Sequence, residues 1–220
     1  AVVGLVGAGG GLVEASLLHE AVERRFLESG HPQNLTCLHA LGIGDRQERG
    51  MNRFAHSGMT RKVIGGHWVW SPRMQQMARD NEIEAYVLPG GVIMQLMREV
   101  AAGRPGLISH VGLGTFVDPR LDGGRMNEAA KSDLTEVITI DGQDYLRYLP
   151  IPISVALLRG SYADEDGNIS LEEEPANLDI YAMAAAAHNS GGKVIFQVKG
   201  KMPRNSMKAR EVRIPAALVE

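Results

Sequence analysis

The start of this chain limits its possible folds most strongly, because an apolar run, a glycine cluster and a helical pattern follow one another directly. Residues 1–6 are apolar and rich in Val, which is typical of a strand buried on both faces. Gly9–Gly11 comes next, and residues 12–28 carry apolar side chains at helical spacing, which predicts a helix with Glu14 in its first turn. Glycines admit a close ligand, and the free N–H groups of a helix start favour an anion or an oxyanion. A tight turn without a ligand is the alternative.

The same order of elements occurs twice more. A predicted strand at Glu84–Leu88 leads through Pro89–Gly91 into a helix that ends at about Ala102. A strand at Arg61–Ile64 leads through Gly65–Trp68 to a helix that runs to Arg79, with Ser71 as its N-cap and Pro72 at its first helical position. Three such units predict an α/β fold with an open, mainly parallel sheet and helices on both of its faces. The carboxyl ends of parallel strands meet at one edge of the sheet, so we expect the three glycine corners to converge.

The second half of the chain has a different pattern. Glu136–Ile140, Tyr145–Leu149 and Val155–Gly160 are predicted strands separated by short turns, and Asp141-Gly142 is a hairpin signal. Some antiparallel hairpins are therefore expected here, followed by a helix over residues 178–188 and a strand over 193–199. Residues 112–127 show no period and are too apolar for a solvated linker, which favours a pocket wall.

Composition excludes several classes of protein. The chain has 220 residues, 44% of them hydrophobic, and a net charge of −3, which fits one large globular domain and gives no general attraction to nucleic acid or anionic membranes. No apolar stretch approaches the roughly 20 residues that a membrane helix needs, and no signal peptide is evident, so we expect a cytoplasmic protein. The chain begins within a strand and ends on an apolar segment, which favours a fragment of a longer polypeptide over a small complete subunit.

The residues alone reveal no metal site and no nucleophile. None of the seven histidines has a metal-binding spacing, and no Gly-x-Ser-x-Gly elbow occurs. Asp164–Asn168 resembles the start of a calcium loop, but Ile169 stands where that loop needs its glycine, and the distal glutamate is missing. Cys37 lies in an apolar run and is expected to be buried. His67 is the histidine beside a glycine corner, where a structural and a functional role both stay open. The basic segment 199–213 is either a solvated loop or a contact for a polyanionic ligand.

Several segments together are similar to one known family. The resemblance is to the N-terminal (α) half of family I coenzyme A transferases, of the single-chain propionate, acetoacetate and short-chain acyl type. The segments are Val6–Gly11 with Glu14, Gly65–Trp68 with Ser71–Arg73, Pro89–Val92, Gly112–Pro119 with Gly123–Asn127, Leu178–Asp179 and Val212–Pro215.

The resemblance implies a fold of the coenzyme A transferase/phosphosugar isomerase type and a ping-pong exchange of CoA between carboxylic acids such as acetate, propionate and acetoacetate. It implies that residues 1–220 form the α domain and that the nucleophilic glutamate lies in an absent β half, because no Glu-Asn-Gly occurs here. Glu14 is not that nucleophile. No metal or redox cofactor is implied, and the CoA thioester is a substrate.

The site residues that the resemblance implies are those that would bind an oxyanion, an acyl group or a carboxylate. They are Gly9, Gly10, Gly11, Pro89, Gly90, Gly91, Gly112, Gly114, Thr115, Phe116, Met126 and Asn127. Many relatives carry glutamine at the place of Gly90, where only the backbone could contribute in this chain. Expected partners are acyl-CoA, a short-chain carboxylate, the β domain or subunit, and further copies of the same enzyme. A non-catalytic acyl-CoA or carboxylate binding module and a phosphosugar isomerase-like enzyme are the alternatives.

Overall fold

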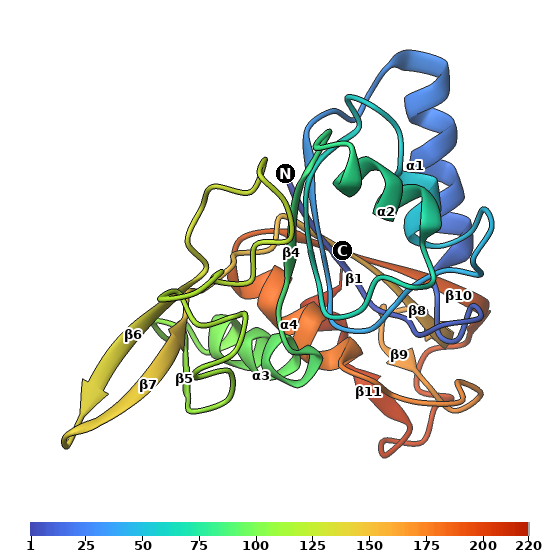
Figure 1. Cartoon of the computed structure of the whole chain (residues 1–220). Helices are drawn as coiled ribbons and strands as arrows, with labels where there is room; N and C mark the ends of the chain where they lie inside the picture. Colours follow the sequence, from blue (N-terminus) through green and yellow to red (C-terminus); the bar gives the residue numbers. More distant parts are fainter. Residues whose placement is uncertain (220) are drawn as a thin grey trace.

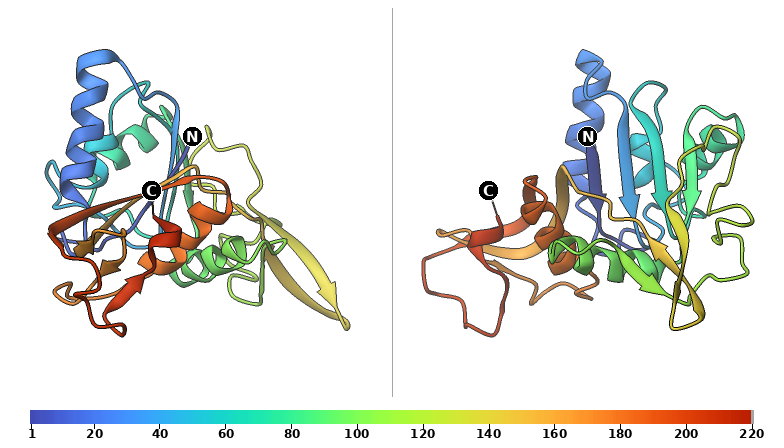
Figure 2. Two further views of the ribbon diagram at one scale, coloured as in Figure 1. Left: turned by 180° about the vertical axis from the view of Figure 1, so that it is seen from behind. Right: turned by 90° about the vertical axis from the view of Figure 1, so that its left-hand side faces the viewer.

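Six parallel strands form the centre of the structure, a computed structural model that describes residues 1–219 (Figure 1). They lie in the order β4-β3-β2-β1-β8-β10 within an eight-stranded sheet, and Figure 2 shows β1 to β4 side by side. Their bounds are β1 (Val2–Leu5), β2 (Leu35–His39), β3 (Thr60–Gly65), β4 (Glu84–Val87), β8 (Val155–Asp164) and β10 (Lys193–Met202). The short strands β9 (Ile169–Ser170) and β11 (Val212–Ile214) extend the sheet in antiparallel fashion.

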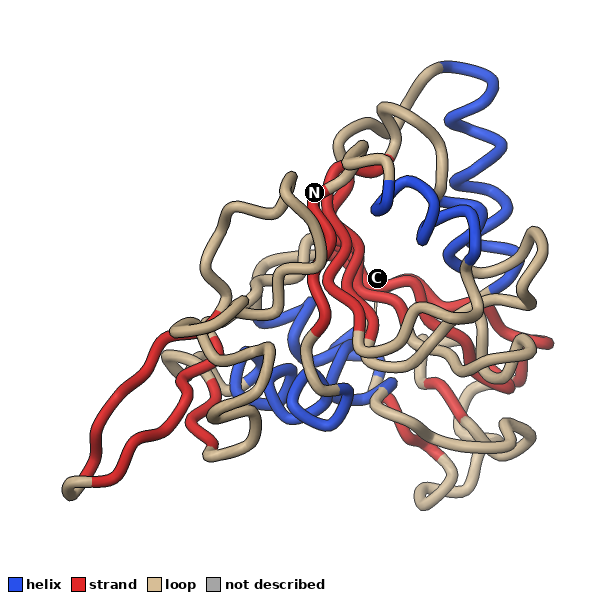
Figure 3. Tube along the Cα trace, viewed as in Figure 1, coloured by secondary structure: helices blue, strands red, loops and turns tan. Residues whose placement is uncertain are grey.

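Helices cover both faces of this sheet, as Figure 3 shows. The helix α1 (Ser16–Ser29), the helix α2 (Pro72–Arg79) and the 3-10 turn η1 (Met51–Phe54) pack on one face; α3 (Gly90–Ala101) and α4 (Ile180–Asn189) pack on the other. A second 3-10 turn, η2 (Ala216–Leu218), follows β11. Because side chains alternate along a strand, Val63 joins the core on the α2 face while Ile64 joins the core on the α3 face. The predicted mainly parallel sheet with helices on both faces is confirmed.

A smaller antiparallel sheet stands apart from the main one. It contains β5 (Leu107–Ser109), β7 (Gln143–Tyr148) and β6 (Thr135–Ile140), and the β6–β7 hairpin projects away from the domain (Figure 1). Asp141 and Gly142 both have positive φ angles, 50° and 78°, so the predicted hairpin turn is confirmed. The strand predicted at Val155–Gly160 does not continue this meander, because it is part of β8 in the main sheet.

Two local predictions about helix starts need correction. The helix predicted from Leu12 begins at Ser16, because the Ala8 N–H donates to the Leu12 carbonyl (2.8 Å) and Val13 has a positive φ of 58°, which is incompatible with a helix. Glu14 therefore lies before α1 and not in its first turn. Pro72 starts α2 as predicted, but the Ser71 hydroxyl donates to the Trp68 carbonyl instead of capping the helix.

Within residues 1–219, no helix is long and apolar enough to cross a membrane.

Candidate functional site

The loops that follow β1, β2, β3 and β4 meet at one edge of the sheet and enclose a surface hollow. We call it the glycine hollow; its lining residues are Ala8, Gly9, Ala40, Leu41, Gly42, Gly66, His67, Trp70 and Gly90. All four loops leave the carboxyl ends of parallel strands, which is where open α/β sheets bind ligands. The structure thus brings together the three glycine corners as predicted, through Gly9, Gly66 and Gly90.

The floor of the glycine hollow is made of backbone that tolerates no side chains. A Cβ added to Gly66 would collide with the Ala40 carbonyl oxygen and would lie 2.9 Å from the Cα of Gly90. A Cβ added to Gly90 would lie 2.8 Å from the same oxygen. Glycine at both positions therefore lets three loops pack backbone against backbone. A glutamine at position 90 would therefore need a shift of the loop after β2.

Backbone N–H groups at the start of α3 lie at the edge of the hollow, because Gly90, the first residue of this helix, is one of the lining residues. Pro89 is the N-cap, and its carbonyl accepts the N–H groups of Val92 (2.9 Å) and Ile93 (3.1 Å). The N–H groups of Gly90 and Gly91 lie in the first turn, where a helix offers no carbonyl partner. Gly10 differs, because its N–H already donates to the Gly44 carbonyl at 2.9 Å. The α3 end is therefore better suited than the first glycine corner to bind a developing oxyanion.

His67 and Trp70 are the two ring side chains of the hollow, and both come from the loop after β3. A Cβ on Gly42 would collide with the His67 ring and would lie 2.6 Å from the Trp70 ring, so both rings rest directly on Gly42. Among the described residues that line the hollow, His67 is the one with a titratable side chain, and none is Cys, Lys, Asp or Glu. Trp68, predicted to lie at this corner, points into the core on the α2 face.

Glu14 lies beneath the first glycine corner and was not predicted to be buried. Its side chain has no exposed surface, and its Oε1 accepts the Gly44 N–H at 2.6 Å while Oε2 has no hydrogen-bond partner among the described residues. Burial raises the pKa of Glu14 to about 7, although the Gly44 N–H and Arg49 oppose the shift. The carboxyl group ties the loop after β1 to the loop after β2, and so helps to fix one side of the hollow.

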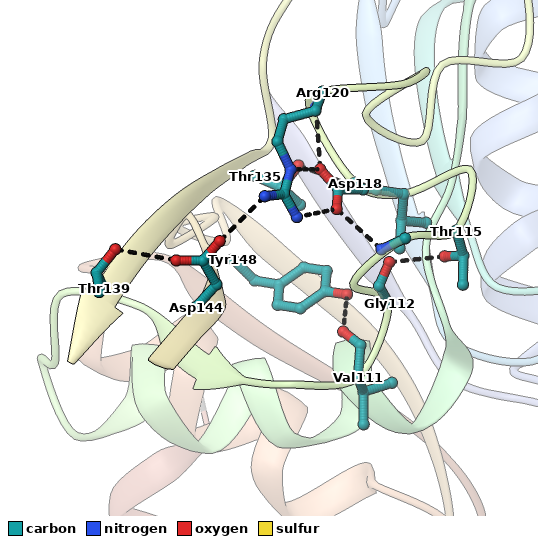
Figure 4. Close-up of polar contacts among 11 residues, drawn as sticks. Val111, Gly112, Thr115, Asp118, Arg120, Thr135, Thr139, Asp144 and Tyr148 are labelled. Atoms are coloured by element: carbon teal, nitrogen blue, oxygen red, sulfur yellow. Dashed lines mark hydrogen bonds and ion pairs between the residues drawn. The ribbon is translucent and has the colours of Figure 1, made fainter. Parts of the chain in front are cut away.

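The aperiodic segment 112–127 is organised by one buried carboxylate, Asp118 (Figure 4). Its oxygens accept the N–H groups of Gly114 (2.9 Å) and Arg120 (3.0 Å) and a two-point contact from the Arg120 guanidinium. These contacts, with the Arg120 guanidinium first, hold the pKa of Asp118 well below its usual range. Arg120 also pairs with Asp144 on β7 at 3.0 Å, which joins the segment to the small sheet.

Asp118→Ala is expected to lower the free energy of unfolding by about 2 kcal/mol, because it leaves two backbone N–H groups without their acceptor. Asp144→Ala is the matched control: it removes the half-exposed partner of the same arginine and should cost less than about 1 kcal/mol. Urea unfolding of the full-length protein measures both. Equal losses of unfolding free energy in the two variants would show that Asp118 stabilises the fold only through its ion pair with Arg120, and not through the two backbone N–H groups.

The other predicted site residues lie outside the lining of the glycine hollow. Gly112, Gly114, Thr115 and Phe116 belong to the segment that Asp118 organises, and Phe116 is 49% exposed. Met126 and Asn127 line a separate hollow beside α2. The Asn127 amide is fully engaged within the chain, since it donates to the carbonyls of Ala78 and Ile83 at 2.8 Å and accepts the Ala85 N–H at 3.2 Å. Their contact with substrate stays a prediction.

In the part of the chain that the structure describes, no three His, Cys, Asp or Glu side chains are grouped so that they could hold a metal ion. Cys37 is fully buried, as expected.

Comparison with known proteins gives one consistent family. The family profile described as coenzyme A transferase matches residues 16–220. The acetate CoA-transferase YdiF of Escherichia coli (strain K12) is 39% identical over 216 residues, which are 98% of this chain and 41% of YdiF. The caffeate CoA-transferase of Acetobacterium woodii is 46% identical over 200 residues, 91% of this chain and 38% of that protein.

A solved structure agrees with these sequence matches. The crystal structure of YdiF from E. coli O157:H7, described as a thioester complex with CoA, superposes with a TM-score of 0.97 at 39% identity, over 100% of this chain and 43% of the YdiF chain. The chain thus spans about two fifths of the length of the relatives it matches. Because profile, sequence and fold agree over nearly all of its residues, the chain belongs to the coenzyme A transferase family.

Proposed function

We propose that the complete protein exchanges CoA between an acyl-CoA and a short-chain carboxylic acid such as acetate, propionate or acetoacetate. The observation that carries the proposal is the glycine hollow, where loops from four parallel strands meet at the N–H groups that begin α3. Similarity to the acetate CoA-transferase YdiF, and the thioester complex with CoA described for that enzyme, support the substrate class.

The proposed division of labour gives this chain the oxyanion and acyl side of the site. No carboxylate lines the glycine hollow, and Glu14 is buried beneath its corner with its carboxyl group bonded to Gly44. The nucleophilic glutamate is therefore assigned to a β half, for which the relatives leave room because this chain matches only 41% of YdiF. Assembly with that half, and pairing of whole enzymes into a homo-oligomer, are part of the proposal.

The proposed route has two additions at carbonyl carbons. The glutamate carboxylate attacks the thioester carbonyl, and the C–S bond breaks. CoA leaves as a thiolate, and an acyl-glutamyl anhydride remains on the enzyme. The thiolate then attacks the glutamyl carbonyl of the anhydride, and the C–O bond to the acyl group breaks. The acyl group leaves as a free carboxylate, and a glutamyl-CoA thioester remains on the enzyme. A second acid reverses both steps. Each addition develops an oxyanion, which the N–H groups of Gly90 and Gly91 would stabilise.

The exchange needs no metal or redox cofactor, because both acids keep their oxidation state and one thioester replaces another. We also propose a cytoplasmic location, where charged CoA thioesters are available as substrates.

The test uses the full-length protein incubated with propionyl-CoA and then with borohydride, which reduces a glutamyl-CoA thioester. We expect exchange of CoA onto acetate and a mass shift on a glutamate-containing peptide outside residues 1–220. A shift on a peptide within residues 1–220 would overturn the division of labour. Binding of acyl-CoA without any exchange would leave a non-catalytic binding module instead, and binding of a sugar phosphate would favour the isomerase-like alternative.

A further inference from the structure

We propose that Trp70 sets the size of the acyl group that the site accepts, because its indole is the largest side chain that lines the glycine hollow. The inference rests on the proposed CoA exchange and names the residue that selects among acids. Six of the nine lining residues are glycine or alanine, so the room in the hollow is limited by the three larger side chains, Leu41, His67 and Trp70. Trp70 is the largest of these.

The backbone of Trp70 is fixed by the neighbouring loop. Its carbonyl oxygen accepts the Arg46 N–H at 3.0 Å and the Asn52 side-chain amide at 3.2 Å. Gly44 packs against the same carbonyl so closely that a Cβ on Gly44 would collide with it. Asn52 is itself fully buried. These contacts hold the residue in place before any ligand arrives.

The ring of Trp70 is fixed as well. A Cβ on Gly9 would collide with the indole, so the ring lies in direct contact with the first glycine corner. The Arg46 guanidinium stacks over the ring at 4.6 Å from its centre. A wall held through both backbone and ring cannot yield to a larger ligand without losing these contacts. It therefore limits size instead of adapting to it.

The position of the ring matches the chemistry of the proposed exchange. A carbonyl oxygen held at the N–H groups of Gly90 and Gly91 leaves the acyl chain in the same hollow, where it needs an apolar surface. The glycines of the floor offer backbone alone, and His67 offers a polar ring. Leu41 and Trp70 are the two large apolar side chains of the hollow, and the indole of Trp70, the larger of the two, is the surface that short chains contact and longer chains meet. CoA is identical in every reaction, so the loss of a contact between Trp70 and CoA would change kcat/KM for all acids by the same factor.

The test compares kcat/KM of the full-length protein for CoA transfer to acetate, butyrate and hexanoate. In Trp70→Ala we expect the hexanoate-to-acetate ratio to rise about tenfold or more, since a pocket with added room gains from each extra methylene. Trp70→Phe keeps a ring and should shift the ratio in the same direction by about threefold. Val69→Ala is the control: Val69 is 47% exposed in the same loop, does not line the hollow, and should leave the ratio unchanged.

If Trp70→Ala and Trp70→Phe change kcat/KM by the same factor for all three acids, the proposal is overturned. Thermal unfolding identifies a variant that does not fold, and Trp70→Phe then decides. Absence of transfer to any acid in the wild-type protein would count against the proposed function and not against the wall. In that case, calorimetric Kd values for acetyl-CoA and hexanoyl-CoA decide instead: Trp70→Ala must improve the relative affinity for hexanoyl-CoA about tenfold, and an unchanged ratio of the two Kd values rejects the inference.

Discussion

Gly66→Ala is expected to abolish CoA transfer and to lower the free energy of unfolding by about 3 kcal/mol. The new methyl group would collide with the Ala40 carbonyl oxygen and lie 2.9 Å from the Cα of Gly90. Both neighbours are backbone, so neither can rotate away as a flexible side chain could. The loops after β2 and β3 must move apart, and the start of α3 moves with them. The N–H groups of Gly90 and Gly91, which we propose as oxyanion donors, would then lose their alignment with the hollow.

Gly200→Ala is the matched control for this prediction. Gly200 lies in β10, far from the glycine hollow in the sheet order, and an added Cβ would meet the Tyr162 ring at an ordinary 3.6 Å. We expect a stability change within about 1 kcal/mol and normal transfer activity. Urea unfolding and steady-state exchange measure both properties. A Gly66→Ala enzyme with wild-type activity would show that the packing of these three loops does not position the donors.

The fold could be predicted because its signals are local. Strands buried on both faces are largely apolar, as β1 (Val-Val-Gly-Leu) shows, and a glycine corner follows β1, β3 and β4. Helix starts were harder, because the flexible cluster at Gly9–Gly11 allows several paths. The chain closes a turn there before α1 begins, and this turn is held by contacts of Gly10 and Glu14 with Gly44 in another loop, which local sequence signals do not reveal.

The site could be predicted only in part, for a related reason. The convergence of Gly9, Gly66 and Gly90 follows from the parallel order of the strands. Trp70 was not singled out, because its role depends on contacts with Gly9 and Gly42 in other loops. Asp118 escaped notice for the same reason, since its partner arginine is held from β7 by Asp144, 24 residues away. Polar loops such as residues 42–50 carry no pattern that reveals which groups they will bury.

For Glu14→Gln, the free energy of unfolding minus that of the wild type is expected to rise by about 2–3 kcal/mol between pH 5 and pH 8. Burial raises the folded-state pKa of Glu14 to about 7, whereas in the unfolded chain this carboxyl group has its ordinary pKa of 4.5. Between these values the folded state binds the proton that the unfolded state releases. The carboxyl group therefore stabilises the fold fully below pH 4.5, and this contribution is lost as pH rises through about 7. Glutamine keeps the size and the acceptor for Gly44 but does not ionise.

The comparison of variant with wild type is needed because two histidines act in the opposite direction. Burial lowers the pKa of His19 and His39 to about 4, so their contribution is present above about pH 6.5 and is lost as pH falls. These losses are the same in both proteins and cancel in the difference. Urea unfolding at half-unit steps of pH gives that difference directly. A difference that does not change with pH would mean that Glu14 stays charged in the folded protein. In that case the attraction of Arg49, which lowers the pKa of Glu14, would have to outweigh burial and the repulsion of Asp45, which both raise it.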